Sequence, residues 1–246
     1  MSEPVVLITG GARRIGAATA RGLHAKGWRV IVHYRSSSRA AEQLIGELNQ
    51  QRANSAQALA ADLTQLDDVE SLAHAAINEW GQLDALINNA STFYPTPIGS
   101  ATEQQWDDLI GSNLKAPFFL AQHLCEALTK TSGAIVNIAD IHADRPLSEH
   151  SLYCIAKAGN VMLTKSLARE LAPGVRVNGV APGAIMWPED SAELSDTAKA
   201  AIVDKIALKR AGAADDIART IDFLLNDAPY ITGQIIAVDG GRTLSN

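Results

Sequence analysis

The sequence predicts an α/β protein built on one doubly wound parallel β-sheet of about seven strands, with helices on both faces. Short apolar runs alternate with longer segments of helical periodicity along all 246 residues, which favours repeated strand–helix–strand units. The runs are apolar at consecutive positions, as expected of strands that helices cover on both sides. No linker, repeat or low-complexity segment interrupts the alternation, so residues 1–246 are predicted to form a single domain.

Seven runs are predicted as strands. The first is followed by Gly10-Gly11 and the last by Asp239-Gly240-Gly241, and such residues mark turns. The third consists mainly of alanine and is the weakest of the set. The predicted strands span residues 5–9, 28–34, 56–60, 83–87, 134–138, 175–180 and 235–238.

The segments between the strands have the spacing or composition of helices. They span residues 17–26, 40–50, 66–80, 102–130, 152–171, 197–206 and 215–225. Pro117 is expected to bend the long region 102–130, because proline has no amide to donate within a helix. Residues 182–195 form the longest irregular segment, which makes them a candidate lid over a site.

The composition excludes several classes of protein. Hydrophobic residues make up 47% and charged residues 20%, so the chain is neither disordered, collagen-like nor a disulfide scaffold. The net charge of -6 gives no global attraction to nucleic acid or to an anionic membrane. We expect Cys125 and Cys154 to be reduced thiols in a cytoplasmic protein. Neither a signal peptide nor a membrane-spanning segment is expected.

A glycine-rich turn between the first strand and the first helix is the strongest local motif. Gly10 and Gly16 would let the backbone approach a pyrophosphate, and the helix N-terminus would supply free amides. This is the phosphate site of a Rossmann-type fold, although the spacing is longer than G-x-G-x-x-G. A tight turn without ligand is the alternative.

The end of the second predicted strand indicates which dinucleotide binds. Residues 33–39 contain Arg35, Ser36 and Ser37, and no acid occurs before Glu42. An acid here usually binds the ribose 2′-hydroxyl of NAD, whereas basic and small polar groups suit a 2′-phosphate. We therefore predict NADPH rather than NADH as cofactor, with a solvated basic turn as the alternative.

Together with the glycine turn, three later motifs resemble those of the short-chain dehydrogenase/reductase superfamily. Asn88-Asn89-Ala90 follows the fourth strand, Tyr153 and Lys157 form a Tyr-x-x-x-Lys pair on a helix, and Pro182-Gly183 follows the sixth strand. The resemblance covers nearly the whole chain, with the motifs in the expected order. It implies a Rossmann-type, NADP-binding domain over residues 1–246.

Within that superfamily, the details resemble the pteridine reductases. The turn has Arg14 where most relatives have glycine, and the segments 33–36 and 88–97 resemble the corresponding segments of that group. Asp140 lies thirteen residues before Tyr153, where most relatives have serine and pteridine reductases have aspartate. The resemblance implies reduction of a 7,8-dihydropterin, with dihydrobiopterin, dihydromonapterin and dihydrofolate as candidate substrates.

The resemblance also assigns roles to residues. Catalytic roles fall to Asp140, Tyr153, Lys157 and Asn113. NADPH would contact Gly10, Arg14, Ile15, Gly16, His33, Tyr34, Arg35, Ser36, Ser37, Asp62, Leu63, Asn89, Ala90, Tyr153, Lys157, Pro182 and Gly183. The pterin would contact Arg14, Ser91, Phe93, Asp140, Tyr153 and Trp187, with Phe93 stacked on its ring.

Each role has a chemical basis and a simpler alternative. Lys157 shares a helix face with Tyr153, and its ammonium, together with the oxidised nicotinamide, is expected to lower the pKa of the phenol. A carboxyl group at Asp140 suits proton delivery to an imine-like nitrogen better than a hydroxyl does. The alternatives are a helix cap for Asp140 or Asp62, a polar helix residue for Asn113, and a core or interface residue for Phe93. Asn113 would shape a backbone site for a water linked to Lys157.

Two other functions remain open, a carbonyl reductase acting on a 3-oxoacyl thioester and a non-catalytic NADPH sensor. Asp140 and the Phe93 segment argue against the first, and Tyr153 with Lys157 against the second. Residues 185–190 are expected to line or cover the site, and no metal is implied. By resemblance, a homotetramer is expected to assemble through the helices at 102–130 and 152–171.

Overall fold

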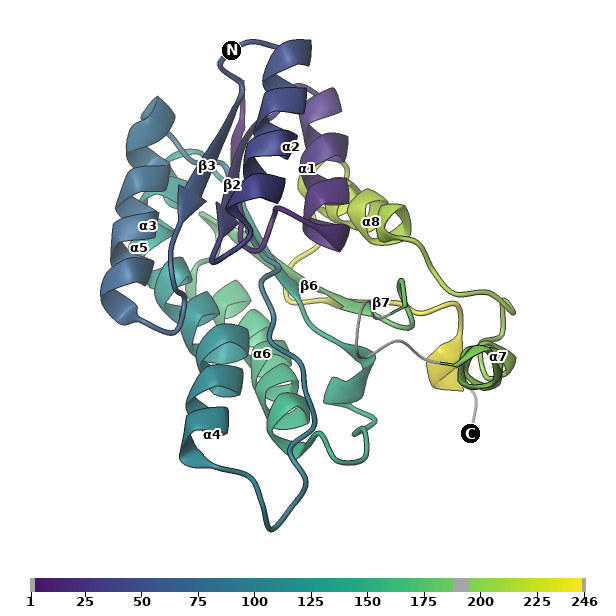
Figure 1. The fold of residues 1–246 in the computed structure, drawn as a ribbon. Helices are drawn as coiled ribbons and strands as arrows, with labels where there is room; N and C mark the ends of the chain where they lie inside the picture. Colours follow the sequence, from purple (N-terminus) through teal and green to yellow (C-terminus); the bar gives the residue numbers. More distant parts are fainter. Residues whose placement is uncertain (1–2, 188–194, 245–246) are drawn as a thin grey trace.

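The computed structural model describes residues 3–187 and 195–244. Its seven strands form one parallel sheet in the order β3-β2-β1-β4-β5-β6-β7 (Figure 1), which confirms the predicted fold class. The strands are β1 (Val5–Ile8), β2 (Arg29–Tyr34), β3 (Ala56–Ala60), β4 (Ala85–Asn88), β5 (Ala134–Ile138), β6 (Arg176–Pro182) and β7 (Ile235–Val238). The strand order reverses between β1 and β4, and in such sheets a crevice for ligands opens at that point.

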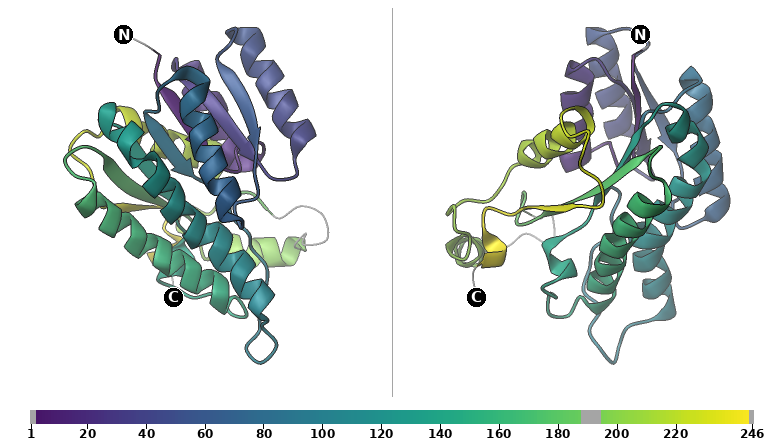
Figure 2. Two further views of the ribbon diagram at one scale, coloured as in Figure 1. Left: turned by 90° about the vertical axis from the view of Figure 1, so that its left-hand side faces the viewer. Right: turned by 180° about the vertical axis from the view of Figure 1, so that it is seen from behind.

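Two layers of helices cover the sheet (Figures 1 and 2). One face carries α1 (Arg14–Ala25), α2 (Ser38–Gln51) and α8 (Ala214–Asn226), and the other carries α3 (Leu66–Trp80), α5 (Ala116–Lys130) and α6 (Ser151–Glu170). Successive strand residues alternate between the two cores: Val6 and Ile8 of β1 face the first layer, whereas Val5 and Leu7 face the second.

The remaining helices extend the molecule beyond the carboxyl ends of the strands. Helix α4 (Glu103–Ile110) packs beside α6, and α7 (Asp196–Asp204) lies apart from both layers (Figure 1). In the part of the chain that is described, none of the helices combines the length and hydropathy needed to cross a membrane. Cys125 and Cys154 are both free thiols.

The long helical region between 102 and 130 departs from α geometry before the expected proline. A π-helical turn over Gly111–Lys115 separates α4 from α5, and Pro117 lies in the first turn of α5. Because Pro117 has no amide, the carbonyl of Asn113 lacks its helical donor. The side-chain amide of Asn160 on α6 donates to that carbonyl instead, at 3.1 Å, so the irregular turn docks on α6.

The first helix also begins earlier than predicted, at Arg14 rather than at residue 17. Arg14 has a φ of +52°, a left-handed conformation that is uncommon for residues other than glycine. The glycine turn therefore passes directly into α1, and the side chain of Arg14 stands at the helix N-terminus.

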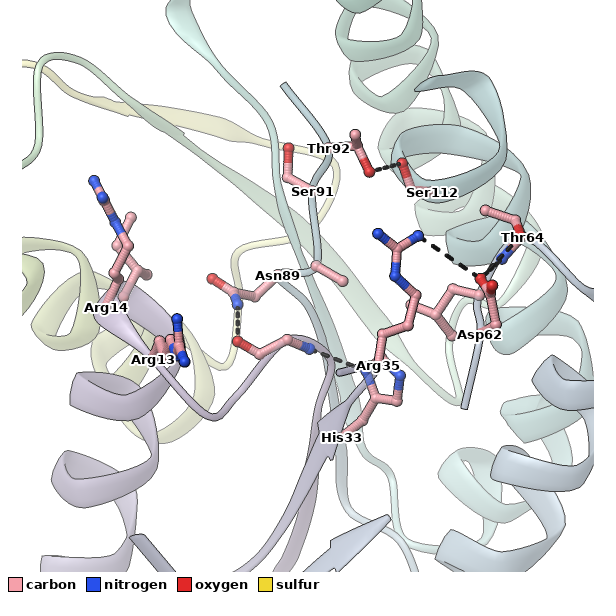
Figure 3. Close-up of a pocket in the computed structure, with 15 residues that line it drawn as sticks. Arg13, Arg14, His33, Arg35, Asp62, Thr64, Asn89, Ser91, Thr92 and Ser112 are labelled. Carbon is pink, nitrogen blue, oxygen red and sulfur yellow. Dashed lines mark hydrogen bonds and ion pairs between the residues drawn. The ribbon is translucent and has the colours of Figure 1, made fainter. Parts of the chain in front are cut away.

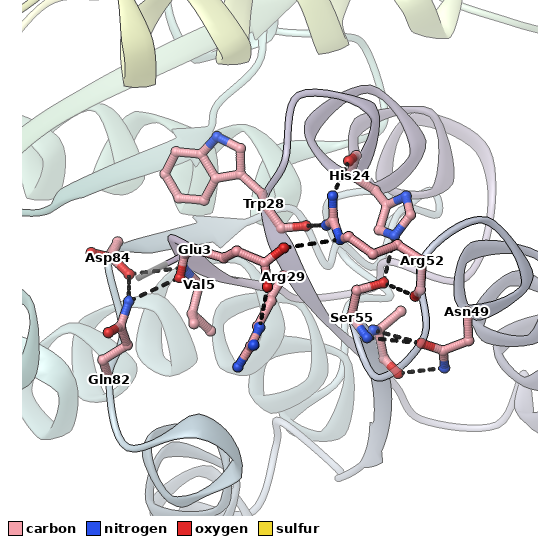
Figure 4. Close-up of polar contacts among 11 residues, drawn as sticks. Glu3, Val5, His24, Trp28, Arg29, Asn49, Arg52, Ser55, Gln82 and Asp84 are labelled. Atoms are coloured by element: carbon pink, nitrogen blue, oxygen red, sulfur yellow. Dashed lines mark hydrogen bonds and ion pairs between the residues drawn. The ribbon is translucent and has the colours of Figure 1, made fainter. Parts of the chain in front are cut away.

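A polar cluster joins the amino ends of the strands, at the edge opposite the crevice (Figure 4). Glu3 accepts from Arg29 at 2.7 Å and pairs with Arg52 at 3.3 Å. Arg52 also donates to the backbone carbonyl of His24, whose imidazole lies 2.7 Å from the hydroxyl of Ser55. These bonds connect the segment before β1 to α1 and to the segment that enters β3.

Two buried histidines make the stability of the fold depend on pH. Burial lowers the pKa of both His24 and His33, whereas the imidazoles of the unfolded chain titrate near 6.5. The unfolded state therefore binds more protons as the pH falls below that value, and the free energy of unfolding should decrease. Urea denaturation at pH 7.5, 6.5 and 5.5 measures this decrease. The variant His24→Asn should show a shallower pH dependence than the wild type, and equal slopes in the two proteins would contradict the assignment.

Candidate active site

The glycine turn packs tightly against the end of β4. A Cβ added to Gly10, whose φ is +59°, would lie 2.9 Å from Cα of Ala90, and one added to Gly16 would lie 2.7 Å from Cα of Gly11. The side-chain amide of Asn89 donates to the carbonyls of Thr9 and Gly10 at 2.9 and 3.0 Å. These positions require glycine, and the packing leaves the first amides of α1 facing the crevice.

A cavity of about 360 Å³ lies in front of this turn (Figure 3). Most of the predicted cofactor residues line it, and so does Ser91, which the sequence analysis assigned to the substrate. They come from the turn and from the ends of β2, β3 and β4: Gly10, Arg14, Ile15, Gly16, His33, Arg35, Asp62, Leu63, Asn89, Ala90 and Ser91. The structure thus brings together at the crevice segments that lie up to eighty residues apart in the sequence.

Several predicted cofactor residues do not line this cavity. Tyr34 is partly buried and packs against the hydrophobic core, while Ser36 and Ser37 precede α2. Pro182 ends β6, and the amide of Gly183 donates to the carbonyl of Val238 at 3.0 Å. These residues lie outside the cavity around the glycine turn, so contact with a longer ligand remains a prediction for them.

Arg13, which was not among the predicted residues, is exposed and lines the cavity from the turn (Figure 3). Thr64, Thr92 and Ser112 line it as well. Arg13 could have been found from the motif itself, because it lies between Gly10 and Gly16 at the helix N-terminus, where an anion would bind. Thr92 and Ser112 had no local signal.

Arg35 has acidic neighbours that the sequence did not reveal. Its guanidinium lies 4.0 Å from Asp62 and 3.8 Å from Asp108 of α4. The sequence has no acid between Arg35 and Glu42, but the fold brings carboxylates from distant segments close to this arginine. At these distances and on an exposed side chain, such pairs are weak, so Arg35 remains able to turn towards an anion.

Asp62 is not the cap of the next helix. It accepts from the amide of Thr64 at 3.0 Å and from its hydroxyl at 2.8 Å, within the loop that precedes α3. The N-cap position of α3 is Gln65, which makes no capping bond through its side chain. The bonds from Thr64 lower the pKa of Asp62, so it is a carboxylate on the wall of the cavity.

Asp140, Tyr153 and Lys157 lie together at the carboxyl end of β5. The hydroxyl of Tyr153 donates to Oδ2 of Asp140 at 2.7 Å. The ammonium of Lys157 donates to the carbonyl of Ile138 at 2.8 Å and lies 5.6 Å from the centre of the Tyr153 ring. Asp140 also accepts from the amide of His142 at 2.8 Å, so it caps a short 3₁₀ turn while it holds the phenol.

Within the protein alone, the pKa of Tyr153 is raised, and the lowering by Lys157 together with an oxidised nicotinamide stays a prediction. Burial and the carboxylate of Asp140 raise the pKa of Tyr153, and the hydroxyl of Ser91 opposes them only in part. Burial also lowers the pKa of Lys157 to about 8, against the attraction of Asp140. In the absence of a cofactor, Tyr153 is therefore a neutral phenol, and so a proton donor.

Asn113 acts on the site through its side chain. Its Oδ1 accepts from the hydroxyl of Ser91 at 2.7 Å, and its Nδ2 donates to the carbonyls of Thr92 and Leu109 at 3.0 Å. Its backbone carbonyl accepts from the side-chain amide of Asn160 at 3.1 Å, and the implied water at this carbonyl stays a prediction. Through its side chain, Asn113 orients Ser91 towards the phenol.

An aromatic ring lies against the phenol and is itself stacked on a second ring. Phe93, which is 51% exposed, lies edge-on to Tyr153 with 4.8 Å between ring centroids. It is stacked on His150 at 4.6 Å with an interplanar angle of 16°, a contact that no sequence pattern indicated. Phe93 is therefore neither a core residue nor remote from the reacting groups, and its ring is accessible.

The segment after β6 reaches the glycine turn. Arg14 donates to the carbonyls of Met186 and Trp187 at 3.4 Å, so it joins the start of this segment to α1. Trp187 is partly exposed. Pro188, Glu189 and Asp190, which were expected to line or cover the site, lie outside the described residues. Among those described, no group of three or more His, Cys, Asp or Glu side chains forms a candidate metal site.

The geometry fits a dinucleotide. Glycines that cannot be replaced lie where a pyrophosphate would approach. Free helix amides and three arginines face the same cavity. The phenol that can donate a proton lies beyond Ser91. The adenosine end would lie near Arg13 and Arg35, and the nicotinamide end near Tyr153 and Lys157.

Comparison with known proteins agrees with this geometry. Residues 10–243 match a family model described as enoyl-(acyl carrier protein) reductase. Pteridine reductase 1 of Leishmania tarentolae is 36% identical over 285 residues, covering 99% of this chain and 98% of that protein. The 3-oxoacyl-[acyl-carrier-protein] reductase FabG of Staphylococcus epidermidis is 39% identical over 238 residues, covering 96% and 97%. The 3beta-hydroxysteroid dehydrogenase 1 of Eggerthella lenta is 34% identical over 244 residues, covering 97% and 93%.

The coupling between Asp140 and Tyr153 can be measured without any substrate. Replacing the carboxylate in Asp140→Asn should lower the pKa of Tyr153, because the amide carries no charge to oppose a phenolate. Ultraviolet difference titration of the phenolate band measures the shift, with Tyr153→Phe identifying the signal that belongs to this residue. An identical titration in the wild type and in Asp140→Asn would show that the two groups are not coupled.

Proposed function

The chain belongs to the short-chain dehydrogenase/reductase family, and we propose that it is an NADPH-dependent pteridine reductase. It would reduce a 7,8-dihydropterin, or dihydrofolate, to the tetrahydro form. The observation that carries the proposal is the 2.7 Å hydrogen bond between Asp140 and Tyr153, with the exposed ring of Phe93 beside it.

A carboxylate at this place favours an imine over a carbonyl as substrate. Hydride addition to a carbonyl leaves negative charge on oxygen, and Asp140 would repel that charge. A C=N nitrogen, unlike a carbonyl oxygen, is basic enough to take up its proton before the hydride arrives, and the carboxylate of Asp140 would stabilise the resulting iminium cation. Hydride addition then gives a neutral amine. Tyr153 would be the proton donor, and its proton would be replaced from water.

Each residue of the site has a part in the proposed reaction. NADPH supplies the hydride when it is bound. Tyr153 donates the proton to the ring nitrogen, either directly or through water, and Asp140 holds the phenol in place. Lys157 is close enough to the phenol to stabilise its oxygen once the proton has left, and it is placed to hold the nicotinamide ribose. The balance is one dihydropterin, one NADPH and one proton giving one tetrahydropterin and one NADP⁺.

The substrate ring would lie between Phe93 and the nicotinamide. Phe93 offers an accessible aromatic face next to Tyr153, and stacking of flat rings contributes on the order of 1 kcal/mol beyond burial. Ser91 and Arg14 would contact the polar edge of the pterin, and Trp187 would contact a substituent on it. Arg14 would have to exchange its present bonds to Met186 and Trp187 to do so.

The alternative is a 3-oxoacyl thioester reductase, because the FabG protein is as similar to this chain as the pteridine reductase is. Asp140 and Phe93 argue against it for the reasons given above. A non-catalytic NADPH sensor is a further alternative, which the arrangement of Tyr153 and Lys157 disfavours.

NADPH oxidation with three substrates side by side tests the proposal. A 7,8-dihydropterin or dihydrofolate should be turned over, whereas a 3-oxoacyl thioester should not. Tyr153→Phe and Asp140→Asn should each reduce kcat on the order of 10²-fold, because they remove or misplace the proton donor. NADPH binding should be retained in both variants.

Turnover of the thioester alone would replace the proposal by the carbonyl reductase. Binding of NADPH without turnover of any of the three substrates would favour the sensor. Unchanged turnover in Tyr153→Phe would contradict the assigned proton donor, whichever substrate is used.

The cofactor preference should depend on the arginines at the adenosine end. Arg13→Ala and Arg35→Ala should each raise the KM for NADPH about 10-fold, the effect of losing one charge-assisted hydrogen bond. The KM for NADH, which lacks the 2′-phosphate, should change little. Arg21→Ala is a matched control, because Arg21 is engaged by Glu47 outside the cavity. An equal rise of the KM for NADPH and of the KM for NADH would mean that neither arginine contacts the 2′-phosphate.

We also propose that the protein is a cytoplasmic homotetramer assembled through α5 and α6. These helices expose apolar side chains at Phe118, Ile155 and Met162, which are 43%, 50% and 60% exposed in the single chain. A second copy of the chain would cover them.

A further inference from the structure

His33 is a buried histidine whose ring joins two segments at the edge of the crevice. It lies at the end of β2 and is 2% exposed. Its Nδ1 is 3.1 Å from the amide nitrogen of Gly10, and its Nε2 is 3.1 Å from the carbonyl oxygen of Ala61 (Figure 3 shows the bond to Gly10). The ring therefore spans the glycine turn and the segment after β3.

The two bonds define the protonation state of the ring. A backbone amide can only donate, so Nδ1 must be an acceptor, and a carbonyl can only accept, so Nε2 must carry the proton. Only the neutral ring with hydrogen on Nε2 satisfies both partners. Burial lowers the pKa of His33, which agrees with a neutral ring, and of the nearby charges Asp62 raises this pKa while Arg35 lowers it.

The bonds also determine which amides of the turn remain free. Gly11 donates to the backbone carbonyl of His33 at 2.9 Å, so the amides of both Gly10 and Gly11 are engaged by this one residue. On the other side, Asn89 holds the carbonyl of Gly10. The peptide of Gly10 is thus fixed at both ends, and an anion at this site must use the amides farther along, where α1 begins.

We propose that His33 positions the cofactor-binding turn by accepting the amide of Gly10, and that it is not itself a ligand of the cofactor. This inference rests on the proposed NADPH binding but not on the proposed pteridine substrate. Without the bond, the amide of the partly buried Gly10 loses its partner, and the turn that presents Arg14, Ile15 and Gly16 to the phosphates loses its fixed orientation.

Three substitutions separate the two hydrogen bonds. His33→Asn can place a side-chain oxygen near the position of Nδ1 and so keep an acceptor for Gly10. His33→Leu has almost the shape of the asparagine variant but no acceptor. His33→Gln can keep a donor towards Ala61 while it moves the acceptor away from Gly10.

The probe is the Kd of NADPH, measured by titration calorimetry or by nicotinamide fluorescence. We expect His33→Leu and His33→Gln to raise the Kd about 10-fold, the loss of one hydrogen bond, and His33→Asn to remain within about 3-fold of the wild type. The KM for NADPH should follow the same order. The kcat at saturating NADPH should change by less than about 2-fold, because a positioning residue acts on binding and is remote from the proton donor.

Hydrogen exchange at the Gly10 amide gives a second readout that needs neither cofactor nor substrate. The amide should be protected in the wild type and in His33→Asn and should exchange faster in His33→Leu and His33→Gln. Equal NADPH affinity in the asparagine and leucine variants, or equal protection of Gly10 in both, would overturn the proposal. If the wild type failed to bind NADPH, the proposed function would fail, while the exchange data would still test the role of His33.

Discussion

The close packing of the glycine turn between β2 and β4 is the constraint on which the rest of the site depends. The turn must pass within van der Waals distance of Ala90 on one side and meet His33 on the other. Only glycine fits at positions 10 and 16. Because the backbone of these two residues is held in place, the first amides of α1 face the crevice. The reversal of strand order at β1 and β4 creates this crevice. The topology of the sheet and the glycines of the turn therefore form the site together.

The reacting end of the site is organised around a buried lysine. Lys157 is 2% exposed, and its ammonium is compensated by a backbone carbonyl and by the nearby carboxylate of Asp140. That carboxylate has opposite effects on its two neighbours, because it favours the charged lysine and disfavours a charged phenol. The proton is therefore kept on Tyr153 until another positive group enters the site.

The features that were predictable from the sequence are local ones. Hydrophobic periodicity located the strands and the main helices, and the four-residue spacing of Tyr153 and Lys157 placed them on one helix face. The contacts that modify these residues join distant segments, such as Asp108 with Arg35 and Phe93 with His150. No pattern in a single sequence encodes such pairs, because each depends on the packing of α4 and α6 at the carboxyl ends of the strands. The raised pKa of Tyr153 within the protein alone could not be predicted for the same reason, since the burial of the phenol was not visible in the sequence.

The charges along the crevice favour one orientation of the dinucleotide that we propose as cofactor. Arg13 and Arg14 lie at the turn and Arg35 follows β2, whereas Asp140 lies at the far end beside the phenol, near the ammonium of Lys157. The three arginines would attract phosphates to the first end, and the nicotinamide would then be directed towards Tyr153. At the far end, the carboxylate of Asp140 would act on the substrate, because it stabilises the cation that forms when a C=N nitrogen takes up a proton before the hydride arrives. For the proposed reaction, Asp140 thus helps to select the bond that the cofactor reduces.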